Sequence, residues 1–178
     1  MIADYRYKVL IIGDSTVGKT SLTIRYVSGS FIDDLRLTIG VDFYNKTLTM
    51  NEETVKFQLW DFAGEQRFRF LLPQYCKGAN GVFFLYDITK PPTLEHLPEW
   101  ISIVRQSCGS KIPILLIGSK ADLDEYRKVP KEKALQTLKK YNLTDYIELS
   151  SKTGKNVQKS FKKMAKILIK RSEAQQQD

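Results

Sequence analysis

The chain has 178 residues, 42% of them hydrophobic and 11% aromatic, so it is long enough to bury the core of one globular domain. No apolar run approaches the roughly 20 residues of a membrane-spanning helix, and two cysteines, Cys76 and Cys108, are too few for a disulfide framework. The formal charge of +8 does not indicate nucleic-acid binding, because the lysines are dispersed and do not interleave with aromatic residues. We expect a cytoplasmic, monomeric domain over residues 1–172, followed by a short polar tail, 173–178.

Apolar runs separated by segments of helical length predict the order of strands and helices. The run at 9–12 ends at a glycine and is typical of a strand buried on both faces. Residues 41–50 and 53–61 alternate polar and apolar side chains around Asn51 and Glu52, which predicts a half-exposed hairpin. The remaining strands are predicted at 81–88, 112–118 and 146–149, and helices at 19–28, 93–107, 130–141 and 156–172. This alternation favours a mainly parallel sheet with one antiparallel edge strand.

A phosphate-binding loop follows the first predicted strand directly. Residues 13–20 read Gly-Asp-Ser-Thr-Val-Gly-Lys-Thr and fit GxxxxGK[ST] at every fixed position. Glycines let consecutive N–H groups point at phosphate oxygens, and the following helix adds its positive end. Lys19 would neutralise the terminal phosphates, and Thr20 would offer a hydroxyl to Mg²⁺. The phosphate-binding residues predicted here are Asp14, Ser15, Thr16, Val17, Gly18, Lys19, Thr20 and Ser21; a glycine turn before an ordinary helix is the alternative.

Two short elements after buried strands indicate which base is bound. Residues 119–122, Ser-Lys-Ala-Asp, resemble the NKxD element, in which the aspartate accepts two N–H groups on one edge of guanine. Adenine lacks that pair of donors, so Asp122 would select guanine. Residues 148–152, Glu-Leu-Ser-Ser-Lys, resemble the ExSAK element, whose amide at Ser151 would donate to the guanine oxygen. The base-binding residues predicted from these elements are Ser119, Lys120, Asp122, Ser150, Ser151 and Lys152.

Together these elements resemble the small GTPases of the Ras superfamily over nearly the whole chain. Residues 38–43 (TIGVDF), 60–64 (WDFAG) and 86–89 (YDIT) are similar to signatures of the Rab branch. The resemblance implies a GTP-binding molecular switch of signalling or vesicle traffic that hydrolyses GTP. It also implies the doubly wound α/β fold of P-loop NTPases, with a six-stranded, mostly parallel sheet, one antiparallel edge strand and five helices.

The resemblance also assigns roles around the terminal phosphate. Thr38 would ligate Mg²⁺ together with Thr20, Asp61 would hold the ion through water, and the Gly64 amide would bind the terminal phosphate. Lys19, Thr38 and Gly64 would therefore take part in catalysis as well as binding. Hydrolysis would release the two segments that carry Thr38 and Gly64, and this release is what makes such a protein a switch.

Four aromatic residues receive roles by the same resemblance. Phe31 would pack on guanine, although a generic apolar anchor is the competing interpretation. Phe43, Trp60 and Tyr75 would form the aromatic triad that Rab partners contact, while an ordinary aromatic core is the alternative. The implied partners are effectors, an exchange factor and a GTPase-activating protein.

The sequence departs from the family where the attacking water is oriented. Glu65 follows the glycine of the DxxG element where the family has glutamine, and Gln66 comes next. A carboxylate accepts but cannot donate a hydrogen bond, and its charge opposes the phosphates, so we expect slow unaided hydrolysis. Either Glu65 or Gln66 could serve as the catalytic residue. A GTP-binding scaffold without hydrolysis is the main rival function, and a P-loop kinase or ATPase is the second.

Two further departures affect the nucleotide site. Phe62 replaces a usual threonine, and Ser119 replaces a usual asparagine. Serine can keep one of the hydrogen bonds of asparagine, so we expect weaker nucleotide binding with an unchanged preference for guanine.

Two features common in related or catalytic proteins are missing from the sequence. No cysteine follows Cys108, so this chain has no prenylation motif, and a peripheral membrane association has no lipid anchor to support it. Either the chain is truncated or the natural protein is unanchored. The single histidine, His96, has no carboxylate or cysteine partner at a recognisable spacing, and we expect a surface or boundary residue.

Overall fold

The structure, a computed structural model, describes residues 4–50 and 52–176, so Asn51 of the predicted hairpin turn and the last two residues of the predicted tail lie outside it. Six strands form one sheet in the order β2-β3-β1-β4-β5-β6. The strands are β1 (Tyr5–Ile12), β2 (Val41–Met50), β3 (Glu53–Phe62), β4 (Gly81–Asp87), β5 (Ile114–Ser119) and β6 (Asp145–Glu148). β2 pairs with β3 antiparallel at one edge, and every other pair is parallel. The predicted sheet is confirmed.

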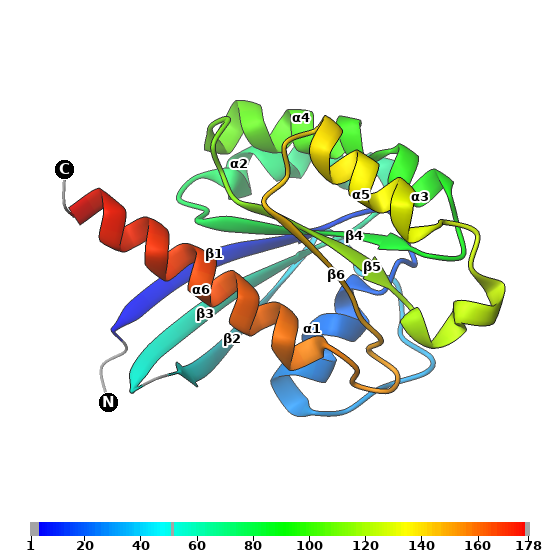
Figure 1. Cartoon of the computed structure of the whole chain (residues 1–178), viewed down its shortest axis with the longest axis horizontal. Coiled ribbons are helices and arrows are strands. Elements are labelled where there is room, and N and C mark those ends of the chain that lie inside the picture. The colour runs from blue at the N-terminus through cyan, green and yellow to red at the C-terminus, as the bar shows by residue number, and fades with distance from the viewer. Residues whose placement is uncertain (1–3, 51, 177–178) are drawn as a thin grey trace.

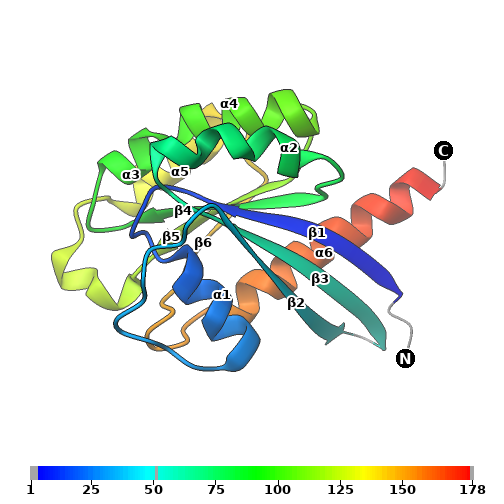
Figure 2. The same cartoon turned by 180° about the vertical axis from the view of Figure 1, so that it is seen from behind.

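Helices cover both faces of the sheet, as the two opposite views show (Figures 1 and 2). The α-helices are α1 (Lys19–Ser28), α2 (Leu72–Cys76), α3 (Pro92–Glu95), α4 (Leu97–Cys108), α5 (Lys131–Lys140) and α6 (Val157–Gln176). α1 and α6 pack on one face, and α2 to α5 pack on the other. Each face has its own apolar cluster, as expected of strands whose side chains alternate between two buried sides.

The helix predictions need three corrections. The described residues contain six α-helices instead of five, and two 3₁₀ helices, η1 (Gln66–Leu71) and η2 (Ala121–Tyr126), were not predicted. The helix expected at 93–107 is divided at His96 into α3 and α4, because Pro98 has no N–H to bond within a continuous helix. α2 has only five residues and a proline, too short to show a helical period.

Two element ends differ from the prediction by four residues, and the other ends differ by two at most. α6 ends at Gln176 instead of Ser172, because the intervening residues are good helix formers without a breaker. β1 begins at Tyr5, four residues before the apolar run, because Tyr5 to Lys8 pair with β3 from Val55 onward. Among the described residues, no helix is long and apolar enough to cross a membrane.

The sheet brings the predicted motifs to one edge. In parallel strands the carboxyl ends meet on the same side, and the loops after β1, β4, β5 and β6 all leave from that side. The phosphate loop follows β1, and the two base-reading elements follow β5 and β6. Because β3 runs parallel to β1, the segment that begins with Gly64 leaves from the same edge.

The α6 side of the core depends on one aromatic cluster. Phe161 is fully buried and stacks on Tyr26 of α1, with ring centroids 3.5 Å apart. It also meets Phe83 edge to face at 4.9 Å and Phe57 at 6.0 Å. One side chain therefore joins both helices of this face to two strands of the sheet.

We expect Phe161→Ala to lower the free energy of unfolding by about 3 to 5 kcal/mol, because it removes a large buried ring and leaves a cavity. Urea unfolding followed by circular dichroism measures the loss. Lys166→Ala, on the exposed side of the same helix, is the control and should change stability by no more than about 0.5 kcal/mol. A loss below about 1 kcal/mol for Phe161→Ala would show that the cluster does not anchor α6.

Candidate nucleotide-binding site

A cavity of about 290 Å³ lies at the carboxyl edge of the sheet. Its walls come from the phosphate loop, the segment before β2, the segment after β3 and the loop after β5. Residues predicted from sequence that line it are Ser15, Thr16, Gly18, Lys19, Thr20, Ser21, Phe31, Thr38, Gly64, Glu65 and Lys120. Phosphate-binding and switch residues from four separate parts of the chain therefore face one space.

The phosphate loop has the conformation that its glycines predict. Gly13 has φ 142°, and a Cβ there would lie 2.3 Å from the Leu85 carbonyl oxygen, so a side chain cannot be accommodated. Gly18 has φ 99° and immediately precedes α1. Thr16 has φ 65° although it is β-branched, a conformation that costs free energy at most positions. The loop thus holds strain at a residue that lines the cavity.

Lys19 is the cation of the loop. Its ammonium group donates a 2.7 Å hydrogen bond to the Asp14 carbonyl oxygen, and only 6% of the residue is exposed. Burial lowers the pKa of Lys19 to about 8, and the nearby Asp61 and Asp14 carboxylates oppose that shift. A bound polyanion would favour the charged form further, as the predicted phosphate contact requires.

Three oxygen atoms from three segments meet beside Lys19. The Thr20 hydroxyl lies 2.7 Å from the Thr38 hydroxyl and 2.5 Å from Asp61 Oδ2. Asp61 is fully buried, and burial raises its pKa to about 6 although the Thr20 hydrogen bond and the Lys19 charge lower it. Its Oδ1 has no hydrogen-bond partner among the described residues. A buried oxygen without a partner, next to two hydroxyls, fits the oxygen ligands that Mg²⁺ prefers.

The described residues contain no cluster of three or more His, Cys, Asp and Glu side chains that could hold a metal alone. Mg²⁺ seldom occupies an all-protein cage and usually keeps phosphate oxygens and water among its ligands. The predicted Mg²⁺-binding residues Thr20, Thr38 and Asp61 lie together and offer oxygen atoms, which suit the ion.

Gly64 approaches the phosphate loop very closely. A Cβ at Gly64 would lie 2.2 Å from the Ser15 nitrogen and 2.6 Å from the Asp14 carbonyl oxygen. Only glycine allows this approach, because any side chain would push the two backbones apart. The segment after β3 is thus held against the loop where the terminal phosphate was predicted.

The two base-reading elements contact each other. The Ser150 hydroxyl donates a 2.6 Å hydrogen bond to Asp122 Oδ1, and the Ala121 amide donates to the Leu149 carbonyl oxygen at 3.0 Å. Ser119 is buried, and its hydroxyl lies 2.5 Å from the Val17 carbonyl oxygen and 2.8 Å from that of Tyr86. Ser119 therefore joins the base-reading element to the phosphate loop with the one donor it has.

Some predicted residues lie outside the walls of the cavity. These are Asp14, Val17, Asp61, Gln66, Ser119, Asp122, Ser150, Ser151 and Lys152. Val17 is buried in the core, and Asp61 lies beneath Thr20. Asp122 is exposed two residues after Lys120, which lines the cavity.

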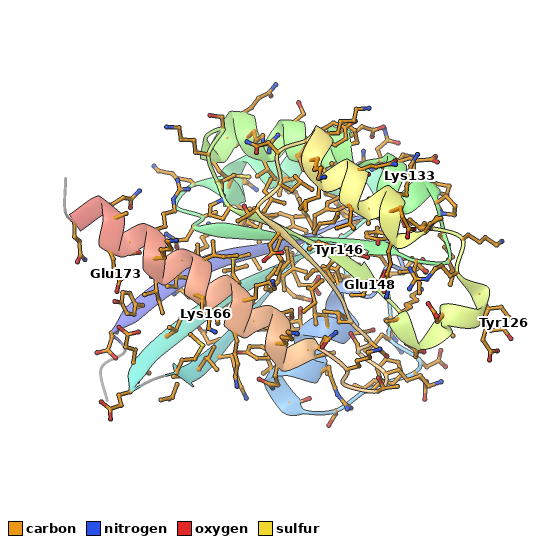
Figure 3. All side chains as sticks on the ribbon, in the orientation of Figure 1. Tyr126, Lys133, Tyr146, Glu148, Lys166 and Glu173 are labelled. Carbon is orange, nitrogen blue, oxygen red and sulfur yellow. The ribbon has the colours of Figure 1, made fainter. Side chains whose placement is uncertain are left out.

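Two ion pairs that support the base-reading elements were missed in the sequence. Lys120 Nζ lies 2.6 Å from the buried Asp87 carboxylate; burial would raise the pKa of Asp87, but hydrogen bonds from Lys120 and Thr89 hold it below its ordinary value. Arg127 contacts both oxygens of Glu148 at 2.8 Å, and the Tyr146 hydroxyl donates to the same carboxylate. Figure 3 shows Tyr146 and Glu148 on β6. No sequence spacing indicates either pair.

Glu65 and Gln66 differ in their surroundings. Glu65 lines the cavity, and its carboxylate pairs with Arg67, Nε to Oε2 at 2.9 Å. Gln66 is exposed at the start of η1. The Phe68 amide donates to the Glu65 carbonyl oxygen at 3.0 Å, and this hydrogen bond closes the turn formed by residues 65–68.

The predicted aromatic triad forms a continuous cluster. Ring centroids lie 4.8 Å apart between Phe43 and Trp60, and 5.3 Å apart between Trp60 and Tyr75. Phe43 is 45% exposed, and the other two are half-buried. The three rings therefore pack on one another and still present an apolar surface.

Comparison with known proteins identifies the family. The Ras family model matches residues 8–170. Ras-related protein RABA4b of Arabidopsis thaliana is 41% identical over 158 residues, which cover 89% of this chain and 70% of that protein. Ras-related protein Rab-1 of Theileria parva is 40% identical over 166 residues, 93% of this chain and 75% of that protein. Ras-related protein Rab-19 of Homo sapiens is 40% identical over 169 residues, 95% of this chain and 78% of that protein. The chain therefore belongs to the Ras family, in which it is a Rab-like GTPase that binds GTP or GDP with Mg²⁺ and hydrolyses GTP.

Proposed function

We propose that the cavity at the phosphate loop is the site of this GTPase activity and that Thr38 and Gly64 act as its switch. The observation that carries the proposal is the meeting of the Thr20, Thr38 and Asp61 oxygens, within 2.7 Å and 2.5 Å of Thr20. These residues come from the phosphate loop, the segment before β2 and the end of β3. One bound ion and one phosphate could therefore tie three segments together.

The residues have distinct roles in this proposal. Lys19 neutralises the terminal phosphates, and Thr20, Thr38 and Asp61 hold the metal. Bound Mg²⁺ would supply positive charge to the phosphate oxygens as the bond to the leaving group breaks. The Gly64 amide binds the terminal phosphate, so loss of that phosphate frees both switch segments.

Base selection is proposed to rest on Asp122. Its carboxylate accepts from guanine, and the 2.6 Å hydrogen bond from Ser150 fixes its orientation. Phe31, Lys120, Ser151 and Lys152 complete the base site by family resemblance. A P-loop kinase or ATPase conflicts with this arrangement, because adenine does not offer the two donors that a carboxylate requires there.

Slow unaided hydrolysis is proposed because Glu65 occupies the water-orienting position. Its carboxylate adds negative charge where charge already develops in the transition state. The pair with Arg67 offsets this only partly, since the Arg67 side chain is 67% exposed and exposed ion pairs contribute little. The scaffold alternative, in which GTP is bound without hydrolysis, rests on the same residue.

Partners of Rab-like proteins include effectors, exchange factors and GTPase-activating proteins. We propose that Phe43, Trp60 and Tyr75 form the surface that these partners contact, and the partial exposure of the cluster supports this role.

We also propose a monomeric, cytoplasmic protein. The family match over 8–170 supports a GTP-binding domain at 1–172, although α6 continues into the proposed tail, 173–178.

We expect Asp122→Asn to weaken GTP binding by about 10²-fold or more and to admit xanthosine triphosphate, whose altered edge suits an amide. Equilibrium titration with fluorescent nucleotides measures both affinities. Asp124→Asn is a matched control, because Asp124 is exposed and pairs only with Arg127 among the described residues. Unchanged GTP affinity in Asp122→Asn would remove Asp122 as the base reader.

Hydrogen exchange should depend on the nucleotide in two segments, 31–40 and 62–75. We expect slower exchange with a non-hydrolysable GTP analogue than with GDP, because only the terminal phosphate ties Thr38 and Gly64. Mass spectrometry of peptic peptides gives the comparison, and peptides from α6 serve as an internal control. Equal protection in both states would indicate a GTP-binding protein without a switch.

Glu65→Gln is expected to raise the intrinsic hydrolysis rate by about tenfold or more, because an amide can donate to the phosphate and carries no charge. Phosphate release under single turnover measures the rate, with nucleotide loading checked for each protein. Glu65→Ala separates removal of the charge from gain of the amide.

Gln66→Ala tests the competing hypothesis that a local shift lets Gln66 orient the water. If Gln66→Ala loses activity while Glu65→Gln is no faster than the parent, Gln66 is the catalytic residue. A third hypothesis is that an activating protein supplies both an arginine and a glutamine, and an arginine finger alone contributes about 10³ to 10⁵ in rate. Neither Glu65 nor Gln66 would then control the stimulated rate.

A further inference from the structure

The side chain of Asp14 lies in a polar cluster beside the phosphate loop, outside the cavity walls. Its carboxylate is 16% exposed and meets donors from three residues. Trp100 Nε1 donates to Oδ1 at 2.9 Å, Arg69 Nη2 lies 3.4 Å from the same oxygen, and His96 Nδ1 lies 2.5 Å from Oδ2. Thus His96, which is 45% exposed as expected of a boundary residue, does have a carboxylate partner, 82 residues away in the chain.

Arg69 carries the connection to switch II, the segment 62–75. Its guanidinium lies over the Trp100 ring, 4.5 Å from the centroid, and its other end contacts Glu99 at 2.5 Å. The side chain is only 15% exposed, although η1 itself is at the surface. A planar guanidinium that stacks on an indole and binds two carboxylates is held in one orientation, which a lysine could not reproduce.

Switch II is therefore attached to the phosphate loop at two points that share one residue. Gly64 packs against the backbone of Asp14 and Ser15, and Arg69 contacts the Asp14 side chain. Glu65 and Gln66 lie between these two points. Their positions relative to the cavity are thus set by the distance between the two attachments.

We propose that Asp14 and Arg69 form a positioning pair that holds Glu65 and Gln66 beside the terminal phosphate. Trp100 and His96 orient the Asp14 carboxylate, and Glu99 supports the outer end of Arg69. The pair acts through switch II and does not touch the reacting atoms. This inference rests on the proposed function, because it requires the terminal phosphate to lie in the cavity that Glu65 lines.

A purely structural role predicts a different result. In that case removing the pair would lower the free energy of unfolding and leave hydrolysis by the folded protein unchanged. A positioning role predicts slower hydrolysis by a protein that still binds GTP, because Arg69 is outside the cavity walls. It also predicts that Asp14 and Arg69 variants are not additive, since each breaks the same contact.

The test compares Arg69→Met, Arg69→Lys, Asp14→Asn and the double variant Asp14→Asn/Arg69→Met, each loaded with GTP. Phosphate release under single turnover is measured together with the rate of nucleotide release and with urea unfolding. We expect Arg69→Met to slow hydrolysis about tenfold or more, the usual size for loss of a charged hydrogen bond, while nucleotide release changes less than about twofold. Arg69→Lys should restore little, and the double variant should be no slower than the slower single variant.

Arg6→Met is the matched control, since Arg6 is an exposed arginine on β1, and it should hydrolyse at the parental rate. Hydrogen exchange of residues 65–71 with a GTP analogue gives a readout independent of hydrolysis and should be faster in Arg69→Met. Parental hydrolysis and parental exchange in Arg69→Met would overturn the positioning pair. If instead Lys19→Ala and Asp122→Asn bound GTP like the parent, the proposed nucleotide site itself would fail.

Discussion

The arrangement of the site depends on the contact between Gly64 and the backbone of Asp14 and Ser15. The contact leaves no space for a Cβ, so two loops from different strands share one narrow region. Such contact is possible only because β1 and β3 run parallel and end at the same edge. A ligand that bonds to both backbones stabilises the contact, and loss of the bonded group weakens it. The switch role proposed for Gly64 rests on this geometry.

Burial of charge makes the same region responsive to a ligand. Lys19 and Asp61 are both almost fully buried, and burial favours the neutral form of each side chain. It lowers the pKa of Lys19 to about 8 and raises the pKa of Asp61 to about 6. A buried charge without a full set of partners is costly, so a bound polyanion and a bound cation each relieve part of that cost. Nucleotide and metal are therefore expected to stabilise the fold as well as the switch.

Local sequence predicts much of this molecule, because its motifs are contiguous and its strands are apolar runs. Contiguous residues alone predict the phosphate loop, the hairpin and the edge of the sheet at which the motifs meet. Pro98 inside the predicted 93–107 helix is a local signal for its division, because proline lacks the N–H that a continuous helix requires. By contrast, Asp14 meets Arg69 and His96 across 55 and 82 residues, and no spacing rule indicates such pairs.

The two arginines of η1 show how one short helix can serve two purposes. In a 3₁₀ helix residues two apart point to different sides, because three residues complete a turn. Arg67 is thus exposed and pairs with Glu65, whereas the Arg69 side chain is only 15% exposed and lies between the phosphate loop and α4. An exposed ion pair is weak, and its side chains readily exchange partners. A guanidinium that stacks on an indole and contacts two carboxylates keeps its position. In the proposed site, the Glu65 side chain could therefore change its orientation while Arg69 keeps the backbone of switch II against the phosphate loop.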